Sequence, residues 1–134
     1  MKTLLLSLLV LTSLSAKDVI LDTSTNLLWQ DASDNKSLSI TYKESQEYCS
    51  KLVIAEYHNF RIPTLRELQT IIDYTNYKPA IIDGFNYISN ESYWTSTPSA
   101  KDQEFIWSIN FTKGERSTNA KYYDRHIRCV QKVK

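Results

Sequence analysis

The sequence predicts an α+β domain, with a small, mostly antiparallel sheet built from strands near both ends of the chain and two helices between them. Three observations predict this order. Short apolar runs separated by turn-forming residues fill positions 19–29, helix-capping patterns begin at Thr41 and Thr64, and residues 105–111 show the alternation of a strand. A chain of 134 residues has room for one such domain.

The domain opens with a predicted β-hairpin. Residues 19–21 and 27–29 have strand composition, and the Asp, Thr, Ser and Asn residues of 22–26 separate them. These residue types favour turns, so the two runs are expected to pair. The polar stretch 31–39 that follows predicts a loop.

The first helix is predicted from a capping box at Thr41 and Glu44, in which each side chain satisfies a free backbone N–H of the other residue. Residues at helical spacing after it form one inward stripe, namely Ser45, Tyr48, Cys49 and Leu52. Cys49 is therefore expected to point into the core.

The second helix is predicted from the segment around Pro63, which disfavours helix at the residue before it. Thr64 and Glu67 form a second capping box, and the helix is expected to end near Asp73 with one apolar face. Arg61 has a planar fork of donors that can hold nearby groups. We assign one structural motif to this segment, made of Arg61, Pro63, Thr64 and Glu67, with an anchor for a ligand as the alternative.

The last part of the chain is strand-like after a long ordered loop over 74–90. Strands are predicted at 93–96, 105–111, 115–119 and 127–130, with a turn at Gly114. In the second of these strands the inward face is expected to hold Phe105, Trp107, Ile109 and Phe111. In the last strand Ile127 and Cys129 share the inward face.

Residues 1–16 have the features of a signal peptide: Lys2, an apolar run over 4–14, and small residues up to Ala16. The run is too short for a membrane span of roughly 20 residues, so residues 17–134 are predicted to be the mature domain, periplasmic or secreted, with no integral span. The full chain has 16 Lys and Arg against 15 Asp and Glu, and cleavage removes Lys2. A neutral mature chain does not suggest nucleic acid as a partner.

The chain has two cysteines, Cys49 and Cys129. In an oxidising compartment two cysteines of one small domain usually pair, and both are predicted to point inward. We therefore predict one helix-to-last-strand disulfide. A metal-bound or reactive pair is the alternative, but neither a C-x-x-C spacing nor neighbouring ligands accompany the cysteines.

Five segments in order resemble the Lcl C-terminal domain, a bacterial family long described as a domain of unknown function. They are residues 22–30, 48–52, 61–68, 93–97 and 127–130. Phe60 stands where the family usually has Trp, so the loop before the second helix is expected to differ. The resemblance implies a C-type-lectin-like fold, similar to that of formylglycine-generating enzymes, in which a first-helix cysteine commonly pairs with one in the last strand.

Little in the sequence points to catalysis or to a metal. The strand that carries calcium ligands in sugar-binding lectins here contains Trp107 and Asn110 but no carboxylate, so no metal site is predicted. His58 and His126 are isolated, and the paired cysteines leave no reactive thiol. We predict neither enzyme activity nor a cofactor.

The candidate ligand-binding residues combine aromatic rings, which can stack on sugars, with arginines, which can hold sulfate or carboxylate. They are Trp94, Trp107, Tyr122, Tyr123, Arg125 and Arg128. Burial of either Trp in the core is the alternative. The function expected is a non-catalytic binding or adhesion module for glycans or sulfated polysaccharides at the cell envelope. An accessory protein acting through an envelope protein partner and a degenerate sulfatase-modifying enzyme are the alternatives, and the oligomeric state is undetermined.

Overall fold

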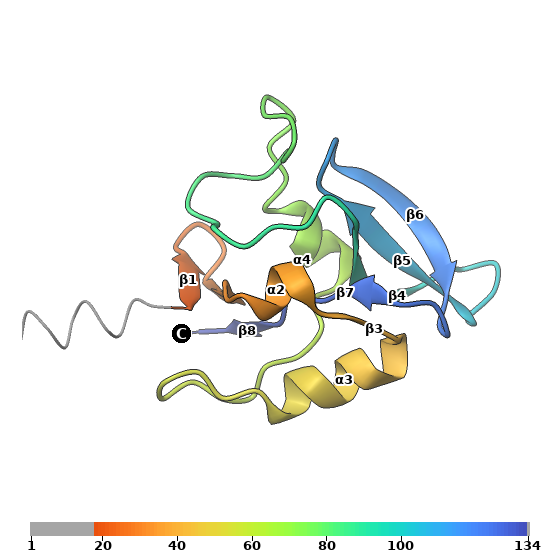
Figure 1. Cartoon of the computed structure of the whole chain (residues 1–134), viewed down its shortest axis with the longest axis horizontal. Coiled ribbons are helices and arrows are strands. Elements are labelled where there is room, and N and C mark those ends of the chain that lie inside the picture. Colours follow the sequence, from red (N-terminus) through yellow and green to blue (C-terminus); the bar gives the residue numbers. More distant parts are fainter. Residues whose placement is uncertain (1–17, 134) are drawn as a thin grey trace, which may run out of the picture.

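The computed structural model describes residues 18–133, so the predicted signal peptide lies outside the described residues. In that range the chain forms three short helices and two sheets (Figure 1). The elements are β1 (Val19–Asp22), β2 (Leu27–Gln30), α2 (Asp34–Ser37), β3 (Ser39–Ile40), α3 (Tyr42–Lys51), α4 (Leu65–Gln69), β4 (Ser92–Pro98), β5 (Phe105–Asn110), β6 (Glu115–Ala120), β7 (Arg125–His126) and β8 (Val130–Lys132).

The strands form a three-stranded sheet of order β1-β2-β8 and a five-stranded sheet of order β3-β7-β4-β5-β6. All pairings are antiparallel except that between β4 and β7. This confirms the α+β class and the mostly antiparallel arrangement. The β1–β2 hairpin and the turn at Gly114, with φ 76°, are also as predicted. The likeness to C-type lectins stays a prediction.

The described residues contain one helix more than the two that were predicted. Helix α2 is a single turn inside the polar stretch expected to be a loop, and four residues are too few to show a helical period. Its Asn35 is fully buried, where the side-chain oxygen accepts the N–H of Ala32 at 2.7 Å and the side-chain nitrogen donates to the carbonyl of Ile127 at 2.9 Å. Tertiary hydrogen bonds therefore stabilise this turn.

Both predicted capping boxes are confirmed, at Thr41–Glu44 and at Thr64–Glu67. Helix α4 is shorter than predicted and ends at Gln69 instead of near Asp73. Beyond it Ile72 forms a β-bridge with Ile81 of the long loop. Backbone pairing with that loop replaces the last turn of the expected helix.

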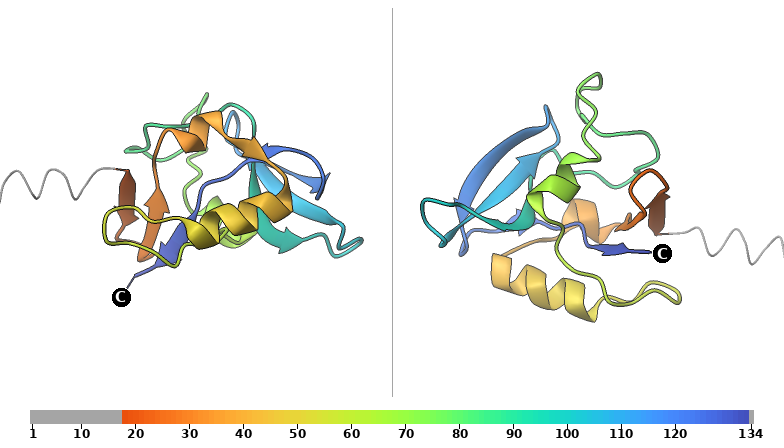
Figure 2. Two further views of the ribbon diagram at one scale, coloured as in Figure 1. Left: turned by 60° about the horizontal axis from the view of Figure 1, so that its bottom comes forward. Right: turned by 180° about the vertical axis from the view of Figure 1, so that it is seen from behind.

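The core consists of two apolar clusters on opposite sides of the strands. Neighbouring residues of an extended chain point to opposite faces, so Tyr93 enters one cluster and Trp94 the other. Val130 at the start of β8 and Cys129 just before it divide between the clusters in the same way. Helix α4 and the long loop cover the first cluster, and α3 covers the second. The views in Figures 1 and 2 place α3 and the long loop on opposite sides of β8.

This two-sided burial corrects the predicted inward face of β5. Phe105 is 39% exposed, whereas Ile106, expected to face outward, is 2% exposed and packs in the cluster covered by α3. Ile109 and Phe111 are buried as predicted, in the other cluster. Because both faces of the strand are covered, alternation does not separate a buried face from a solvent face.

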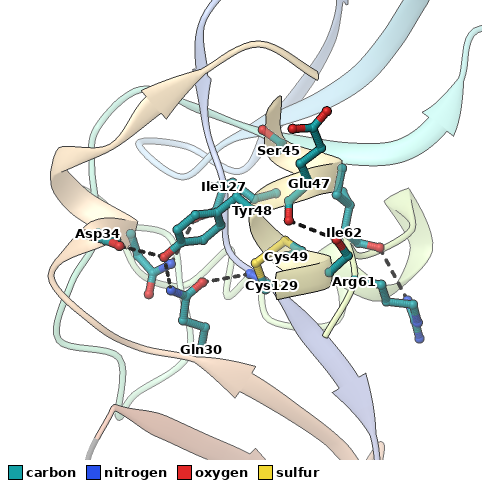
Figure 3. Close-up of a disulfide and its surroundings, with 12 residues drawn as sticks. Gln30, Asp34, Ser45, Glu47, Tyr48, Cys49, Arg61, Ile62, Ile127 and Cys129 are labelled. Atoms are coloured by element: carbon teal, nitrogen blue, oxygen red, sulfur yellow. Dashed lines mark hydrogen bonds between the residues drawn. A yellow bond between two sulfur atoms is a disulfide. The ribbon is translucent and has the colours of Figure 1, made fainter. Parts of the chain in front are cut away.

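The predicted disulfide joins Cys49 of α3 to Cys129, which immediately precedes β8, across a sequence separation of 80 residues. Neither cysteine has exposed surface. Beside it, the side chain of Gln30 accepts the N–H of Cys129 at 3.1 Å and donates to the hydroxyl of Tyr48 at 2.8 Å (Figure 3). The Tyr48 hydroxyl in turn donates to Asp34 at 2.7 Å, so hydrogen bonds link α2, α3 and β2 around the disulfide.

Candidate functional site

The turn between β6 and β7 carries two exposed aromatic rings. Tyr122 is 74% and Tyr123 46% exposed, and their ring centroids lie 4.9 Å apart in an edge-to-face arrangement. The guanidinium carbon of Arg125 lies 5.3 Å from the centroid of the Tyr123 ring, a cation–π contact. We call residues 121–125 the aromatic turn, and it brings together three of the six predicted ligand-binding residues.

Backbone hydrogen bonds fix the aromatic turn to its neighbours. The N–H of Lys121 donates to the carbonyl of Glu104 in the β4–β5 connection at 3.1 Å. The carbonyl of Lys121 accepts the N–H of Tyr42, the first residue of α3, also at 3.1 Å. The backbone that carries the exposed rings is therefore attached both to the β4–β5 connection and to α3.

A cleft of about 710 Å³ lies between the aromatic turn, the first turns of α3, and strands β4 and β5. Two tyrosine rings line it, together with two lysines, apolar residues and uncharged polar side chains. Among the lining residues are Tyr42, Tyr122, Lys43, Lys121, Ile106 and Gln46. No carboxylate is among the described residues that line the cleft.

The electrostatics of the cleft favour an anion. Lys43 makes no ion pair within 4.0 Å in the described part of the chain, and the Lys121 ammonium lies 3.7 Å from Glu104, whose side chain is 77% exposed. Such an exposed pair is weak, so the Lys121 ammonium can still interact with an anion in the cleft. The same ammonium lies 5.9 Å from the centroid of the Tyr42 ring. Burial raises the pKa of Tyr42, which keeps that ring neutral.

The prediction that Trp94 binds a ligand is wrong, because the residue has no exposed surface. Its Nε1 donates to the carbonyl of Ile40 at 2.9 Å, and the ring of Tyr42 packs edge-on against it with centroids 5.7 Å apart. The alternative reading, a core tryptophan, is the one observed. Trp94 packs against Tyr42, whose ring lines the cleft, and so supports that part of the cleft wall.

Arg128 is also fully buried, so its predicted role in ligand binding is wrong. Its guanidinium donates to the carbonyl oxygens of Gln30 and Tyr87 and, at 3.2 Å, to the carboxylate of Asp31. The same carboxylate accepts the backbone N–H groups of Asn86 and Tyr87. This buried ion pair ties β2, the long loop and the C-terminal segment together.

Trp107 lies apart from the aromatic turn. It precedes the buried Ser108 on β5, so its side chain points to the opposite face of the sheet. The guanidinium carbon of Arg116 covers its ring at 5.2 Å from the centroid. The structure therefore does not join Trp107 with the other predicted ligand residues.

The motif around Pro63 has the structural geometry proposed for it. Both terminal nitrogens of Arg61 donate to the Glu67 carboxylate, at 2.7 and 2.8 Å, and this pairing lowers the pKa of Glu67. The carbonyl of Pro63 accepts the N–H of Ser96 on β4 at 2.8 Å, and Arg61 exchanges two backbone hydrogen bonds with Val130 on β8. The motif thus connects α4 to both sheets.

Sequence reasoning did not identify Tyr42, Lys43 and Lys121 as site residues. Tyr42 and Lys43 lie in the first turn of α3, and Lys121 is the first residue after β6, so only the fold brings them together. Within residues 18–133 no three His, Cys, Asp or Glu side chains gather as metal ligands, and no helix has the length and apolar character of a membrane span.

These features define a class of protein: a disulfide-linked α+β domain whose surface presents an aromatic and cationic cleft on a fixed turn. The chain belongs to the Lcl C-terminal domain family, whose sequence profile matches residues 18–131. This confirms the family resemblance identified from the sequence segments. A search of curated protein sequences gives no match.

Proposed function

We propose that this protein is an exported, non-catalytic binding module that takes an acidic glycan, such as a sulfated polysaccharide, into the cleft beside the aromatic turn. The observation that carries the proposal is a cleft with two lysines, two tyrosine rings and no carboxylate. A periplasmic or secreted location accords with the predicted signal peptide and with a disulfide, which persists in oxidising compartments.

The lining of the cleft suits a sugar with negative substituents. The rings of Tyr42 and Tyr122 offer flat apolar surface for a pyranose face, and the side chain of Gln46 offers hydrogen bonds to hydroxyl groups. Lys43 and Lys121 supply point charges for sulfate or carboxylate groups. This lining supports the proposed binding role, of which adhesion at the envelope is one form.

A role as a sulfatase-modifying enzyme receives no support from the cysteines. That chemistry requires a reactive thiol, and Cys49 and Cys129 are joined and buried. Binding through an envelope protein partner alone is the competing proposal, and the experiment below separates it from glycan binding.

The test compares binding of the oxidised protein to heparin and to a glycan array with that of two double variants. Lys43→Ala with Lys121→Ala removes both cleft charges, and Lys36→Ala with Lys132→Ala removes two exposed charges elsewhere as the matched control. We expect at least a tenfold loss of affinity for acidic glycans in the first variant only, and weaker binding by the parent as salt rises. Equal retention of the two variants would refute the proposal and favour a protein partner, which crosslinking in envelope extracts would detect.

A further inference from the structure

A second cavity, of about 470 Å³, is lined by the last two residues of the aromatic turn and shares no lining residue with the cleft. Side chains of both charges line it: Glu91, Asp124, Arg125 and His126. Its uncharged lining consists of Ser39, Ser92 and Asn110. These residues come from strands β3, β4, β5 and β7 and from the segments just before β4 and β7, and the strands come together in Figure 1.

Arg125 is held in position without using a carboxylate. Its Nε donates to the side-chain oxygen of Asn119 at 3.2 Å, and its Nη1 donates to the backbone carbonyl of Asp124 at 2.7 Å. The same Asn119 oxygen accepts the hydroxyl of the buried Ser108 at 2.7 Å, which fixes the amide. With Tyr123 stacked on the guanidinium, Nη2 is the end that makes no hydrogen bond within residues 18–133.

The carboxylates of this cavity are not paired with that arginine. Neither Asp124 nor Glu91 lies within 4.0 Å of the Arg125 guanidinium, although Asp124 is its neighbour in the chain. The guanidinium is turned toward the side chain of Asn119 and the backbone carbonyl of Asp124 instead. The cavity therefore holds a guanidinium and two carboxylates that are not paired with it, and of these Glu91 contacts His126 instead.

The buried His126 is a second, independent feature of this cavity that bears on ligand binding. It is 5% exposed, its Nε2 lies 3.3 Å from the Glu91 carboxylate, and its Nδ1 is buried without a hydrogen-bond partner in the described structure. An unpaired buried polar atom costs free energy, which a ligand or an ordered water bonded to it would recover. The histidine also places the Glu91 carboxylate at the cavity.

We propose that this cavity, which we call the zwitterion pocket, binds an α-amino-acid group, with its carboxylate on Arg125 and its ammonium between Glu91 and Asp124. The volume lies in the range of small-molecule sites. Ser92 and Asn110 add neutral hydrogen-bonding groups around the ligand. The group can come from a free amino acid or from one displayed on a larger molecule, since both carry an ammonium and a carboxylate group on the same α-carbon.

The test is an NMR titration of the oxidised protein with L-alanine, D-alanine and glycine as free ligands, and with Nε-acetyl-L-lysine as a displayed α-amino-acid group. Two analogues, N-acetylalanine and alanine amide, each carry only one of the charges. We expect saturable shifts at the amides of 91–92, 110 and 124–126, and at least tenfold weaker binding of both analogues. A preference for Nε-acetyl-L-lysine over the free amino acids would indicate the displayed source.

Matched variants make the result specific to the pocket. Arg125→Gln and Asp124→Asn are each expected to weaken zwitterion binding at least tenfold, whereas Arg66→Gln and Asp83→Asn, at exposed positions elsewhere, leave it unchanged. Lys43→Ala with Lys121→Ala is expected to leave it unchanged too, which separates this site from the proposed glycan cleft. Absence of saturable shifts with every zwitterion, or equal affinity for the single-charge analogues, would overturn the proposal.

Discussion

Removing the disulfide is expected to destabilise the domain by about 4.5 kcal/mol. The perturbation is the double substitution Cys49→Ala and Cys129→Ala, which leaves no unpaired thiol. The bond closes a segment with a sequence separation of 80 residues, and the chain-entropy relation for a loop of that length gives about 15 cal/mol/K, or about 4.5 kcal/mol at room temperature. Both residues are buried, so the lost sulfur contacts act in the same direction.

Urea unfolding followed by tryptophan fluorescence measures this loss directly, because Trp29 and Trp94 are buried in the two core clusters. For a domain of this size the entropy of unfolding is about 0.25 kcal/mol/K, so the melting temperature should fall by roughly 18 °C. The parent protein after reduction serves as a second measurement of the same loss. A loss below about 1 kcal/mol in both would refute the reasoning, since the loop would then not be the constraint that stabilises the fold.

Three further substitutions test the interactions that connect the elements. Arg128→Met is expected to cost about 3–5 kcal/mol in urea unfolding, because it leaves Asp31 buried without its cation, and a double-mutant cycle with Asp31→Asn should show coupling. Glu67→Gln is expected to cost about 1 kcal/mol at pH 7. Because Arg61 lowers the pKa of Glu67 from its ordinary 4.5, that contribution is present above pH 4.5 and is lost as the pH falls through the folded-state pKa; a difference that persists in acid contradicts the ion pair. Thr64→Ala removes the α4 cap and is expected to cost about 1 kcal/mol, while Thr64→Ser should restore most of it.

The elements that were predictable from the sequence are those determined by neighbouring residues. The capping boxes at Thr41 and Thr64 require only a hydroxyl and a carboxylate three positions apart, and both formed as expected. The β1–β2 hairpin is likewise determined by two short runs and the turn between them. The disulfide needed two additional inferences, that the chain is exported to an oxidising compartment and that both cysteines face the core.

The candidate site was only partly predictable, because burial depends on which segments cover each strand. Trp94 and Arg128 were selected for their side-chain chemistry, and that chemistry is equally useful inside a protein. The indole N–H of Trp94 finds a carbonyl, and Arg128 finds two carbonyls and a carboxylate. Tyr122 and Tyr123 were better candidates because a turn between two strands has less chain available to cover it.

The aromatic turn explains how the two proposed binding sites can lie so close together without compromising the fold. Tyr122 and Lys121 line the cleft, while Asp124 and Arg125 line the zwitterion pocket. The backbone groups of Lys121 fix the turn, whereas the side chains of Tyr122 and Asp124 make no hydrogen bond or ion pair within residues 18–133. Substituting Tyr122 or Asp124 should therefore abolish contacts with a ligand while changing the free energy of unfolding by less than about 0.5 kcal/mol. A larger loss of stability at Tyr122 or Asp124 would mean that the side chains themselves hold the turn, and the two sites could then not vary independently.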